Sequence, residues 1–297
     1  MARCEVCFRH CELQEGKIGF CGARICAGGT VKAANYGRVT SLALDPIEKK
    51  PLNRFMPGSY ILSLGSYGCN LRCPFCQNSE ISWSDQAMRY ADRAELIQPS
   101  QIAQTARYYR RKGNIGAAFT YNEPLVGYEF VRDTAKLVHE AGMVNVLVSN
   151  GTAELAVLEE ILPYIDAMNI DLKGFTDRYY RDVLGGDRGM VMRFIERAVK
   201  SCHVELTTLI IPGENDSEEE MREMCSWIAG LETGNARGAQ GVHGNRSAES
   251  GREIPLHISR FFPRFHMTDR GPTDVRKVYR LAEVAGETLK YVYTGNC

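Results

Sequence analysis

Apolar residues in this chain gather into short continuous runs, separated by longer stretches in which they recur every three or four positions. The runs predict strands at residues 60–66, 115–120, 144–149, 167–172, 203–210 and 256–261. The periodic stretches predict helices at residues 99–111, 126–141, 154–162, 190–201, 217–231 and 274–289, and a short YVYT run follows the last of them. Continuously apolar strands that alternate with helices indicate a parallel sheet.

Six such units predict an α/β fold, a partial (β/α)6 barrel of the TIM type. A doubly wound open sheet fits nearly the same pattern and stays as the alternative. We predict two parts: a cysteine-rich metal-binding module with its connector at residues 1–57, and the barrel at residues 58–297. Residues 232–253 interrupt the alternation of predicted strands and helices. They are rich in Gly, Ser, Asn and Arg, which favours a surface insertion over a functional lid.

The composition restricts the expected cellular location and the classes of binding partner. With 44% hydrophobic and 24% charged residues the chain has the composition of a soluble globular protein. Its formal net charge is zero, which argues against binding to nucleic acid through overall charge. No apolar run approaches the roughly 20 residues of a membrane-spanning helix, and the first residues lack the apolar core of a signal peptide. We therefore expect a cytoplasmic protein that does not bind membranes.

The eleven cysteines are clustered rather than spread. Five lie within the first 26 residues, three occur at Cys69, Cys73 and Cys76, and the rest are scattered. An odd number of cysteines in a long chain without an export signal argues against a disulfide framework. Clustered thiols in a reducing compartment indicate metal binding.

The strongest chemical signal follows the first predicted barrel strand. Cys69, Cys73 and Cys76 form a C-x3-C-x2-C pattern on a loop at the carboxyl end of that strand, where barrel enzymes carry their active sites. Three thiolates can hold three corners of a four-iron cluster and leave the fourth iron open for a ligand. The intervening Leu71, Pro74 and Phe75 are suited to shield such a cluster. A zinc site that lacks its fourth ligand, or buried structural cysteines, are the alternatives.

This pattern resembles the cluster motif of the radical SAM superfamily, and later strand ends extend the resemblance. TYNEP at residues 120–124 resembles the element that holds the methionine ammonium group of S-adenosylmethionine (SAM), although Tyr121 and Asn122 replace its glycines. VSNG at 148–151 and DLK at 171–173 resemble the ribose and carboxylate region of glycyl-radical-enzyme activating enzymes, and the stretch from Ile210 to Asp216 resembles an adenine-contacting segment. The resemblance implies SAM contacts by Phe75, Asn122, Glu123, Pro124, Ser149, Asn150, Asp171, Lys173, Pro212 and Gly213.

Longer blocks, at residues 36–59 and 256–273, resemble the radical SAM member of the AmmeMemoRadiSam system, which is similar to pyruvate formate-lyase activating enzyme. The resemblance implies an enzyme whose [4Fe–4S] cluster cleaves SAM reductively, so that a 5′-deoxyadenosyl radical abstracts hydrogen from a substrate. It further implies a one-electron donor such as ferredoxin or flavodoxin. The substrate stays open between a partner protein and a small molecule, and a non-catalytic iron–sulfur or zinc scaffold is the alternative of another class.

The N-terminal cysteines are the second candidate metal site. Cys4, Cys7, Cys11 and Cys21 have the spacing of a metal knuckle and predict either a zinc site or an auxiliary iron–sulfur cluster, with unliganded thiols as the alternative. His10 and Cys26 are substitute ligands. Near the last predicted strand, Arg260 and His266 are weaker active-site candidates, whereas a histidine among apolar neighbours, such as His257, is typical of packing.

Overall fold

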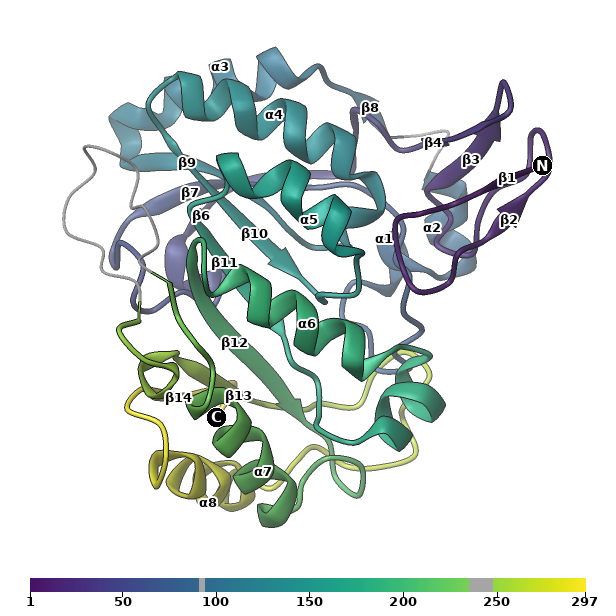
Figure 1. Cartoon of the computed structure of the whole chain (residues 1–297). Helices are drawn as coiled ribbons and strands as arrows, with labels where there is room; N and C mark the ends of the chain where they lie inside the picture. The colour runs from purple at the N-terminus through teal and green to yellow at the C-terminus, as the bar shows by residue number, and fades with distance from the viewer. Residues whose placement is uncertain (91–93, 235–247) are drawn as a thin grey trace.

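The computed structural model describes residues 1–90, 94–234 and 248–297 (Figure 1). One sheet runs in the order β14-β13-β12-β11-β10-β9-β7-β6. Every neighbouring pair in this sheet is parallel except β6 with β7, which is antiparallel. Its strands are β6 (Ser41–Pro46), β7 (Tyr60–Gly65), β9 (Asn114–Phe119), β10 (Val144–Ser149), β11 (Ala167–Asp171), β12 (His203–Ile210), β13 (Leu256–Arg260) and β14 (Val292–Gly295).

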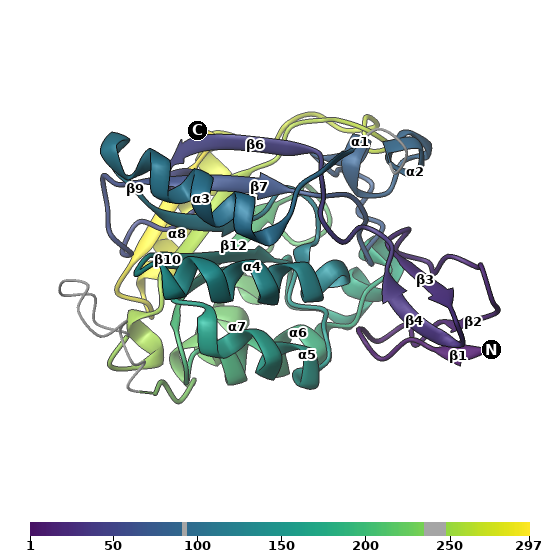
Figure 2. The ribbon, with the colours of Figure 1, turned by 90° about the horizontal axis from the view of Figure 1, so that it is seen from above.

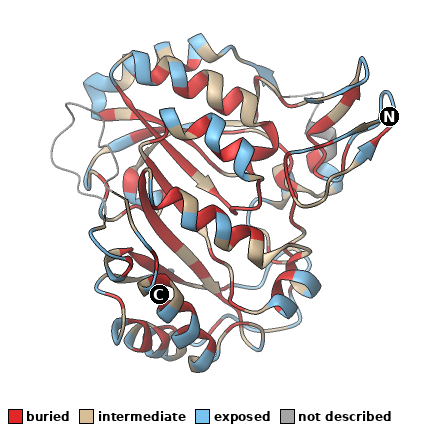
Figure 3. Ribbon diagram, viewed as in Figure 1, coloured by how far each residue is buried: buried red, intermediate tan, exposed pale blue. Residues whose placement is uncertain are grey.

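Helices connect these strands and cover the outer face of the sheet, as Figures 1 and 2 show. Each presents an apolar stripe inward, so the buried positions form a continuous layer against the strands in Figure 3. They are α3 (Pro99–Tyr109), α4 (Tyr128–Glu140), α5 (Leu155–Ile161), α6 (Arg188–Ala198), α7 (Glu218–Ala229) and α8 (Val275–Gly286). None of the described helices is long and apolar enough to cross a bilayer.

The strand order confirms the predicted partial barrel. From β7 to β14 the parallel strands follow one another in chain order, so every right-handed crossover carries its helix to the same side of the sheet. A doubly wound sheet would instead reverse its order in the middle and place helices on both faces. The sheet ends at β6 and β14, and no described strand pairs those two edges.

A segment before β7 fills one end of this incomplete barrel. We call residues 47–59 the strap; it begins with the 3-10 turn Ile47–Lys49 and leads back into β7. Its side chains Ile47, Leu52 and Phe55 are buried in a separate apolar cluster, together with inward-facing strand residues that include Ile61, Ala118 and Val146. The strap thus closes the amino end of the barrel with apolar side chains.

The N-terminal residues form two small hairpins beside the barrel, at the purple end of the chain in Figures 1 and 2. β1 (Ala2–Arg3) pairs with β2 (Glu12–Leu13), and β3 (Arg24–Ala27) pairs with β4 (Thr30–Ala33). Two short helices, α1 (Ser79–Ser82) and α2 (Asp85–Tyr90), follow the cysteine loop, and β5 (Arg38–Val39) pairs with β8 (Glu95–Leu96). Strand β6 lies within residues 1–57 yet belongs to the barrel sheet, and the division of the chain at residue 57 stays a prediction.

The predicted strands at residues 144–149 and 203–210 have the observed bounds, and the other predicted strands and helices differ by a few residues at their ends. Strand β6 was not predicted, because its residues alternate weakly and none of them is fully buried. Of the predicted insertion at 232–253, residues 235–247 lie outside the described part. Residues 251–253 form a 3-10 turn next to α7.

Candidate active site

The loop after β7 brings Cys69, Cys73 and Cys76 together at the carboxyl end of the sheet. The N–H of Cys76 donates to the carbonyl of Cys73 at 3.2 Å, which turns the chain between these two residues. Gly68 has φ +96°, and a Cβ there would lie 2.8 Å from the carbonyl oxygen of Cys21. Only glycine allows the loop to approach the N-terminal module this closely.

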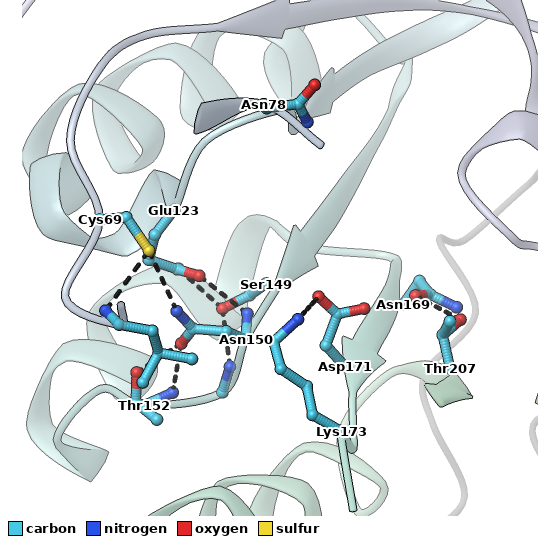
Figure 4. Close-up of polar contacts among 12 residues, drawn as sticks. Cys69, Asn78, Glu123, Ser149, Asn150, Thr152, Asn169, Asp171, Lys173 and Thr207 are labelled. Atoms are coloured by element: carbon cyan, nitrogen blue, oxygen red, sulfur yellow. Dashed lines mark hydrogen bonds and ion pairs between the residues drawn. The ribbon is translucent and has the colours of Figure 1, made fainter. Parts of the chain in front are cut away.

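A chamber of about 580 Å³ adjoins this loop. The three thiol-bearing residues line it together with polar residues that follow neighbouring strands. Those residues, which sequence analysis assigned to SAM, are Asn122, Glu123, Ser149, Asn150, Asp171 and Lys173, and Phe75 lies among them. The strand ends therefore bring most of the predicted set around one space (Figure 4).

Glu123 is the most enclosed carboxylate of this group, with 3% of its surface exposed. It accepts hydrogen bonds from Ser149 Oγ at 2.8 Å, from the N–H of Asn150 at 2.8 Å and from the N–H of Leu125 at 3.1 Å. Burial raises the pKa of Glu123 to about 7, although these hydrogen bonds act in the opposite direction. A cationic ligand in the chamber would favour the charged form of this carboxylate.

Lys173 and Asp171, which also line the chamber, form an ion pair with 2.7 Å between Nζ and Oδ2 (Figure 4). Burial alone would lower the pKa of Lys173, but Asp171 and the nearby Cys73 raise the pKa above its ordinary value. The ammonium group therefore stays charged inside the chamber and is suited to pair with a carboxylate of a ligand.

Asn150 links the loop that carries Cys69, Cys73 and Cys76 to the other residues that line the chamber. Its side-chain amide lies 3.7 Å from Cys69 Sγ and donates to Asn70 Oδ1 at 3.0 Å, while its Oδ1 accepts from the N–H of Thr152 at 2.9 Å. The N–H of Leu71 also points to Cys69 Sγ, at 3.4 Å. Hydrogen bonds of this kind stabilise a thiolate and tune a cluster bound to it.

Five predicted residues are not among the described residues that line the chamber: Pro124, Pro212, Gly213, Arg260 and His266. Pro124 lines a separate small cavity of about 20 Å³. The Pro212 carbonyl accepts from Arg270, and the Gly213 N–H donates to Asp216. Arg260 donates to the carbonyl of Thr273, and the His266 ring packs against Trp83 and Phe265.

The far end of the chamber contains residues to which sequence analysis assigned no chemistry. The strap contributes Glu48, Lys49, Pro51 and Asn53, and the last strands contribute His257 and Tyr293. The rings of His257 and Tyr293 stack, with centroids 5.1 Å apart. His257 thus faces the chamber rather than serving only in packing, and a lone histidine among apolar neighbours gives no sign of this in the sequence.

Glu205 orients His257 and anchors the strap. This carboxylate has no exposed surface and accepts from His257 Nε2 at 2.6 Å and from His203 Nε2 at 3.0 Å. It also accepts from the strap N–H groups of Asn53 at 3.0 Å and Arg54 at 2.7 Å. Burial would raise the pKa of Glu205, but the two histidines lower that pKa to about 2.

The four N-terminal thiols also converge. Cys4, Cys7, Cys11 and Cys21 line one small cavity of about 10 Å³ with Arg9 and Arg24. Burial raises the pKa of Cys21 to about 11. The predicted substitutes lie elsewhere, because Cys26 Sγ contacts Glu15 and the His10 ring contacts Glu5 and Glu154.

The two sets of cysteines fit iron–sulfur clusters better than a single metal ion. Within the described ranges, no three or more His, Cys, Asp or Glu side chains are arranged to hold a metal ion. A four-iron cluster takes each thiolate on a different iron, so its ligands surround a space instead of meeting at one point. Three cysteines around a chamber and four around a cavity fit such clusters by donor chemistry.

Known proteins resemble this chain in sequence and in fold. The sequence model described as "Radical SAM superfamily" matches residues 64–225, more than half of the chain. An uncharacterised protein of Methanocaldococcus jannaschii is 39% identical over 99% of this chain and 81% of its own length. Pyruvate formate-lyase 1-activating enzyme of Escherichia coli K12 is 23% identical over 53% of this chain and 63% of its own length. SuiB of Streptococcus suis, in a structure with S-adenosylmethionine bound, shares the fold with a TM-score of 0.55 at 11% identity, over 78% of this chain and 48% of SuiB.

Proposed function

Because this chain belongs to the radical SAM superfamily and is an enzyme of that type, we propose that Cys69, Cys73 and Cys76 hold its [4Fe–4S] cluster and that SAM binds in the adjoining chamber. The family implies both cofactors. The observation that carries the residue assignment is the chamber lined by all three cysteines, Glu123 and Lys173. Bound together, the reduced cluster and SAM supply one-electron cleavage of a carbon–sulfur bond, followed by abstraction of a hydrogen atom from the substrate.

The chain's own residues bind and orient the cofactor. Glu123 is proposed to accept the methionine ammonium group, with Ser149 and the N–H of Asn150 holding its carboxylate in place. Lys173 is proposed to pair with the methionine carboxylate, and Asp171, Asn122 and Asn150 to bind the ribose and the polar edge of SAM. Phe75 and Leu71 are buried beside the thiols and exclude water from them. Pro124, Pro212 and Gly213 are proposed to act from outside the chamber, by shaping the backbone of their loops.

We propose a partner protein as the substrate, with ferredoxin or flavodoxin as the type of electron donor. The support is that several relatives are named as activating enzymes, among them those for pyruvate formate-lyase and 4-hydroxyphenylacetate decarboxylase. A small-molecule substrate is the second candidate. It is favoured by the polar side chains of His257 and Tyr293 in the chamber lining and by a volume within the range of about 300–1,000 Å³ that small-molecule sites occupy.

The N-terminal module, residues 1–57 in our division, is proposed to carry a second metal at Cys4, Cys7, Cys11 and Cys21. Four thiolates satisfy either zinc or an auxiliary cluster. The support is their convergence on one cavity. A structural role predicts that Cys7→Ser lowers the melting temperature more than it lowers SAM cleavage.

The test of the main proposal is anaerobic reconstitution with iron, sulfide, SAM and dithionite, followed by measurement of 5′-deoxyadenosine. Cys73→Ala should abolish this product. The matched control is Cys202→Ala, which removes a buried thiol just before β12 whose Sγ donates to the carbonyl of Ala198 at the end of α6, and it should retain the product. Equal 5′-deoxyadenosine formation by Cys73→Ala would refute the cluster assignment.

The substrate class is tested with extract from cells grown in heavy water, separated by ultrafiltration. Deuterium should enter 5′-deoxyadenosine when the macromolecular fraction is added, because the abstracted atom comes from the substrate. Deuterium transfer from the low-molecular-weight fraction alone would favour the small-molecule candidate.

The second metal is tested by metal analysis of a Cys69, Cys73 and Cys76 triple alanine variant. Iron and sulfide retained by this variant identify an auxiliary cluster, and one zinc per chain identifies a zinc site. Absence of both metals contradicts the second site.

A further inference from the structure

Two arginine side chains lie against one phenylalanine ring between the two cysteine-bearing segments. The Arg9 guanidinium carbon is 3.4 Å from the centroid of the Phe20 ring, and the Arg72 guanidinium carbon is 3.7 Å from it. Phe20 immediately precedes Cys21, and Arg72 immediately precedes Cys73. We call this group the Arg9–Phe20–Arg72 stack.

The hydrogen bonds of the stack are reciprocal. Arg9, from the N-terminal module, donates through Nε to the carbonyl of Asn70 in the cluster loop at 2.9 Å. Arg72, from the cluster loop, donates to the carbonyl of Phe20 in the N-terminal module. A further bond from Arg72 to the carbonyl of Cys69, at 2.9 Å, fixes the second guanidinium beside the first cluster ligand. Each arginine is therefore held by the segment opposite to its own.

The positive charge of the stack is not neutralised by an ion pair within the described part of the chain. Among the described residues, no carboxylate forms an ion pair with Arg9 or Arg72. Arg9 lines the cavity of the N-terminal thiols. Arg72 lies beside Cys69 through its bond to the Cys69 carbonyl, so the stack adjoins both sets of thiols.

We propose that the Arg9–Phe20–Arg72 stack is a positioning device that sets the reduction potential of the cluster at Cys69, Cys73 and Cys76. Reduction adds one negative charge to a cluster, and a fixed positive charge nearby stabilises the reduced form. The stack keeps two such charges rigidly placed, because each guanidinium is stacked and hydrogen-bonded at once. Arg9 and Phe20 of the N-terminal module thereby influence the redox chemistry of the barrel, although neither lines the chamber.

This inference rests on the proposed cluster, and its experiment separates the two. The full chain, reconstituted anaerobically, is titrated with dithionite while electron paramagnetic resonance follows the signal that changes on addition of SAM. Arg9→Met and Arg72→Met keep an apolar side chain against Phe20 but remove the charge. Arg9→Lys keeps the charge. Arg3→Met is the control, since Arg3 lies in the same module, is largely exposed and pairs with the equally exposed Glu5, at 3.2 Å.

We expect both methionine variants to shift the midpoint potential to more negative values. The ratio of reduced to oxidised cluster at a fixed potential should fall about tenfold, equivalent to about 59 mV for a one-electron couple. Arg9→Lys and Arg3→Met should stay close to the wild-type potential.

The proposal is overturned if both methionine variants keep the wild-type potential, if Arg9→Lys shifts it as far as Arg9→Met, or if Arg3→Met shifts it equally. Loss of the cluster from both methionine variants also overturns it, because the arginines would then serve assembly instead of the potential. A wild-type protein without any SAM-responsive signal would instead contradict the proposed function.

Discussion

The N–H of Cys69 donates a hydrogen bond to the carbonyl oxygen of Cys21 at 3.1 Å. This bond joins the first proposed cluster ligand to the last cysteine of the N-terminal quartet, across 48 positions of sequence. The contact is possible because Gly68, the residue before Cys69, has no side chain at the point where the two segments touch. The two cysteine groups are therefore parts of one packed unit.

Replacing Gly68 by alanine should separate these segments. The new Cβ would lie 2.7 Å from the Ala23 Cβ and would also occupy a backbone conformation with φ +96°. We expect a loss of about 2–4 kcal/mol in the free energy of unfolding, together with lower iron incorporation. The control is Gly16→Ala, at φ +75° with no atom within 4 Å of the new Cβ, which carries the backbone strain alone. Equal losses in the two variants, measured by denaturant unfolding, would contradict the contact.

Glu123 should give the metal-free protein a pH-dependent stability. Its pKa rises from 4.5 to about 7 on folding, so its contribution is fully present below pH 4.5 and is lost as the pH rises through about 7. The expected change is about 3 kcal/mol over this window. Glu123→Gln should remove this component from denaturant unfolding measured across the same pH range. It should also weaken SAM binding about tenfold or more while leaving the iron content unchanged.

Glu205 should make the folded protein less stable as the pH falls, the opposite of the effect of Glu123. Folding lowers its pKa from 4.5 to about 2, so its contribution is present above pH 4.5 and is lost as the pH falls toward 2. Glu205→Gln leaves two histidines and two strap N–H groups around a neutral side chain, and we expect a loss of about 3 kcal/mol at pH 7.

The control for Glu205 is Glu218, whose pKa is also lowered to about 2, by Arg280 first and Arg222 next. Those pairs lie at the surface, where solvent and salt screen them. Glu218→Gln should therefore change the unfolding midpoint little. A larger effect from Glu218→Gln than from Glu205→Gln would contradict the anchoring role of Glu205.

Lys173→Met should weaken SAM binding without loss of the cluster. The substitution removes the proposed partner of the methionine carboxylate and leaves Asp171 unpaired in the chamber. We expect affinity to fall about tenfold or more, measured by equilibrium dialysis with labelled SAM. Lys136→Met, on the exposed face of α4, is the control and should retain wild-type affinity. Loss of iron from Lys173→Met would point to a role in holding the cluster loop.

The barrel could be predicted from the sequence because its strands are buried on both faces and therefore form continuous apolar runs, as in β7, with five buried positions. The cysteine loop and the polar strand ends were predictable for a related reason, since parallel strands bring their carboxyl ends to one edge. The sequence did not predict that the strap closes the amino end of the barrel and lines the chamber. Its Glu48 and Lys49 lie in a charged segment that carries no sign of a site in the sequence. The strap reaches the chamber through the hydrogen bonds of Asn53 and Arg54 to Glu205.

The roles of His257 and of the Arg9–Phe20–Arg72 stack could not be predicted either, because both depend on contacts between residues far apart in the sequence. A single histidine on an apolar strand carries no sign of the carboxylate that orients it, which lies 52 positions earlier. Likewise, Arg9 and Arg72 are ordinary basic residues in sequence, and their shared contact with Phe20 arises only when the two cysteine segments meet.

The hydrogen bond from the N–H of Arg54 to Glu205 joins residues 151 positions apart. During synthesis the cysteine loop leaves the ribosome long before β12 does. Its thiols therefore emerge before Glu205 is available to anchor the strap. Iron delivered at that stage would meet a loop that is still exposed to water and oxidants, because the barrel around it has not yet formed. Loading of the proposed cluster should accordingly wait until β12 has been synthesised and the strap has docked on Glu205.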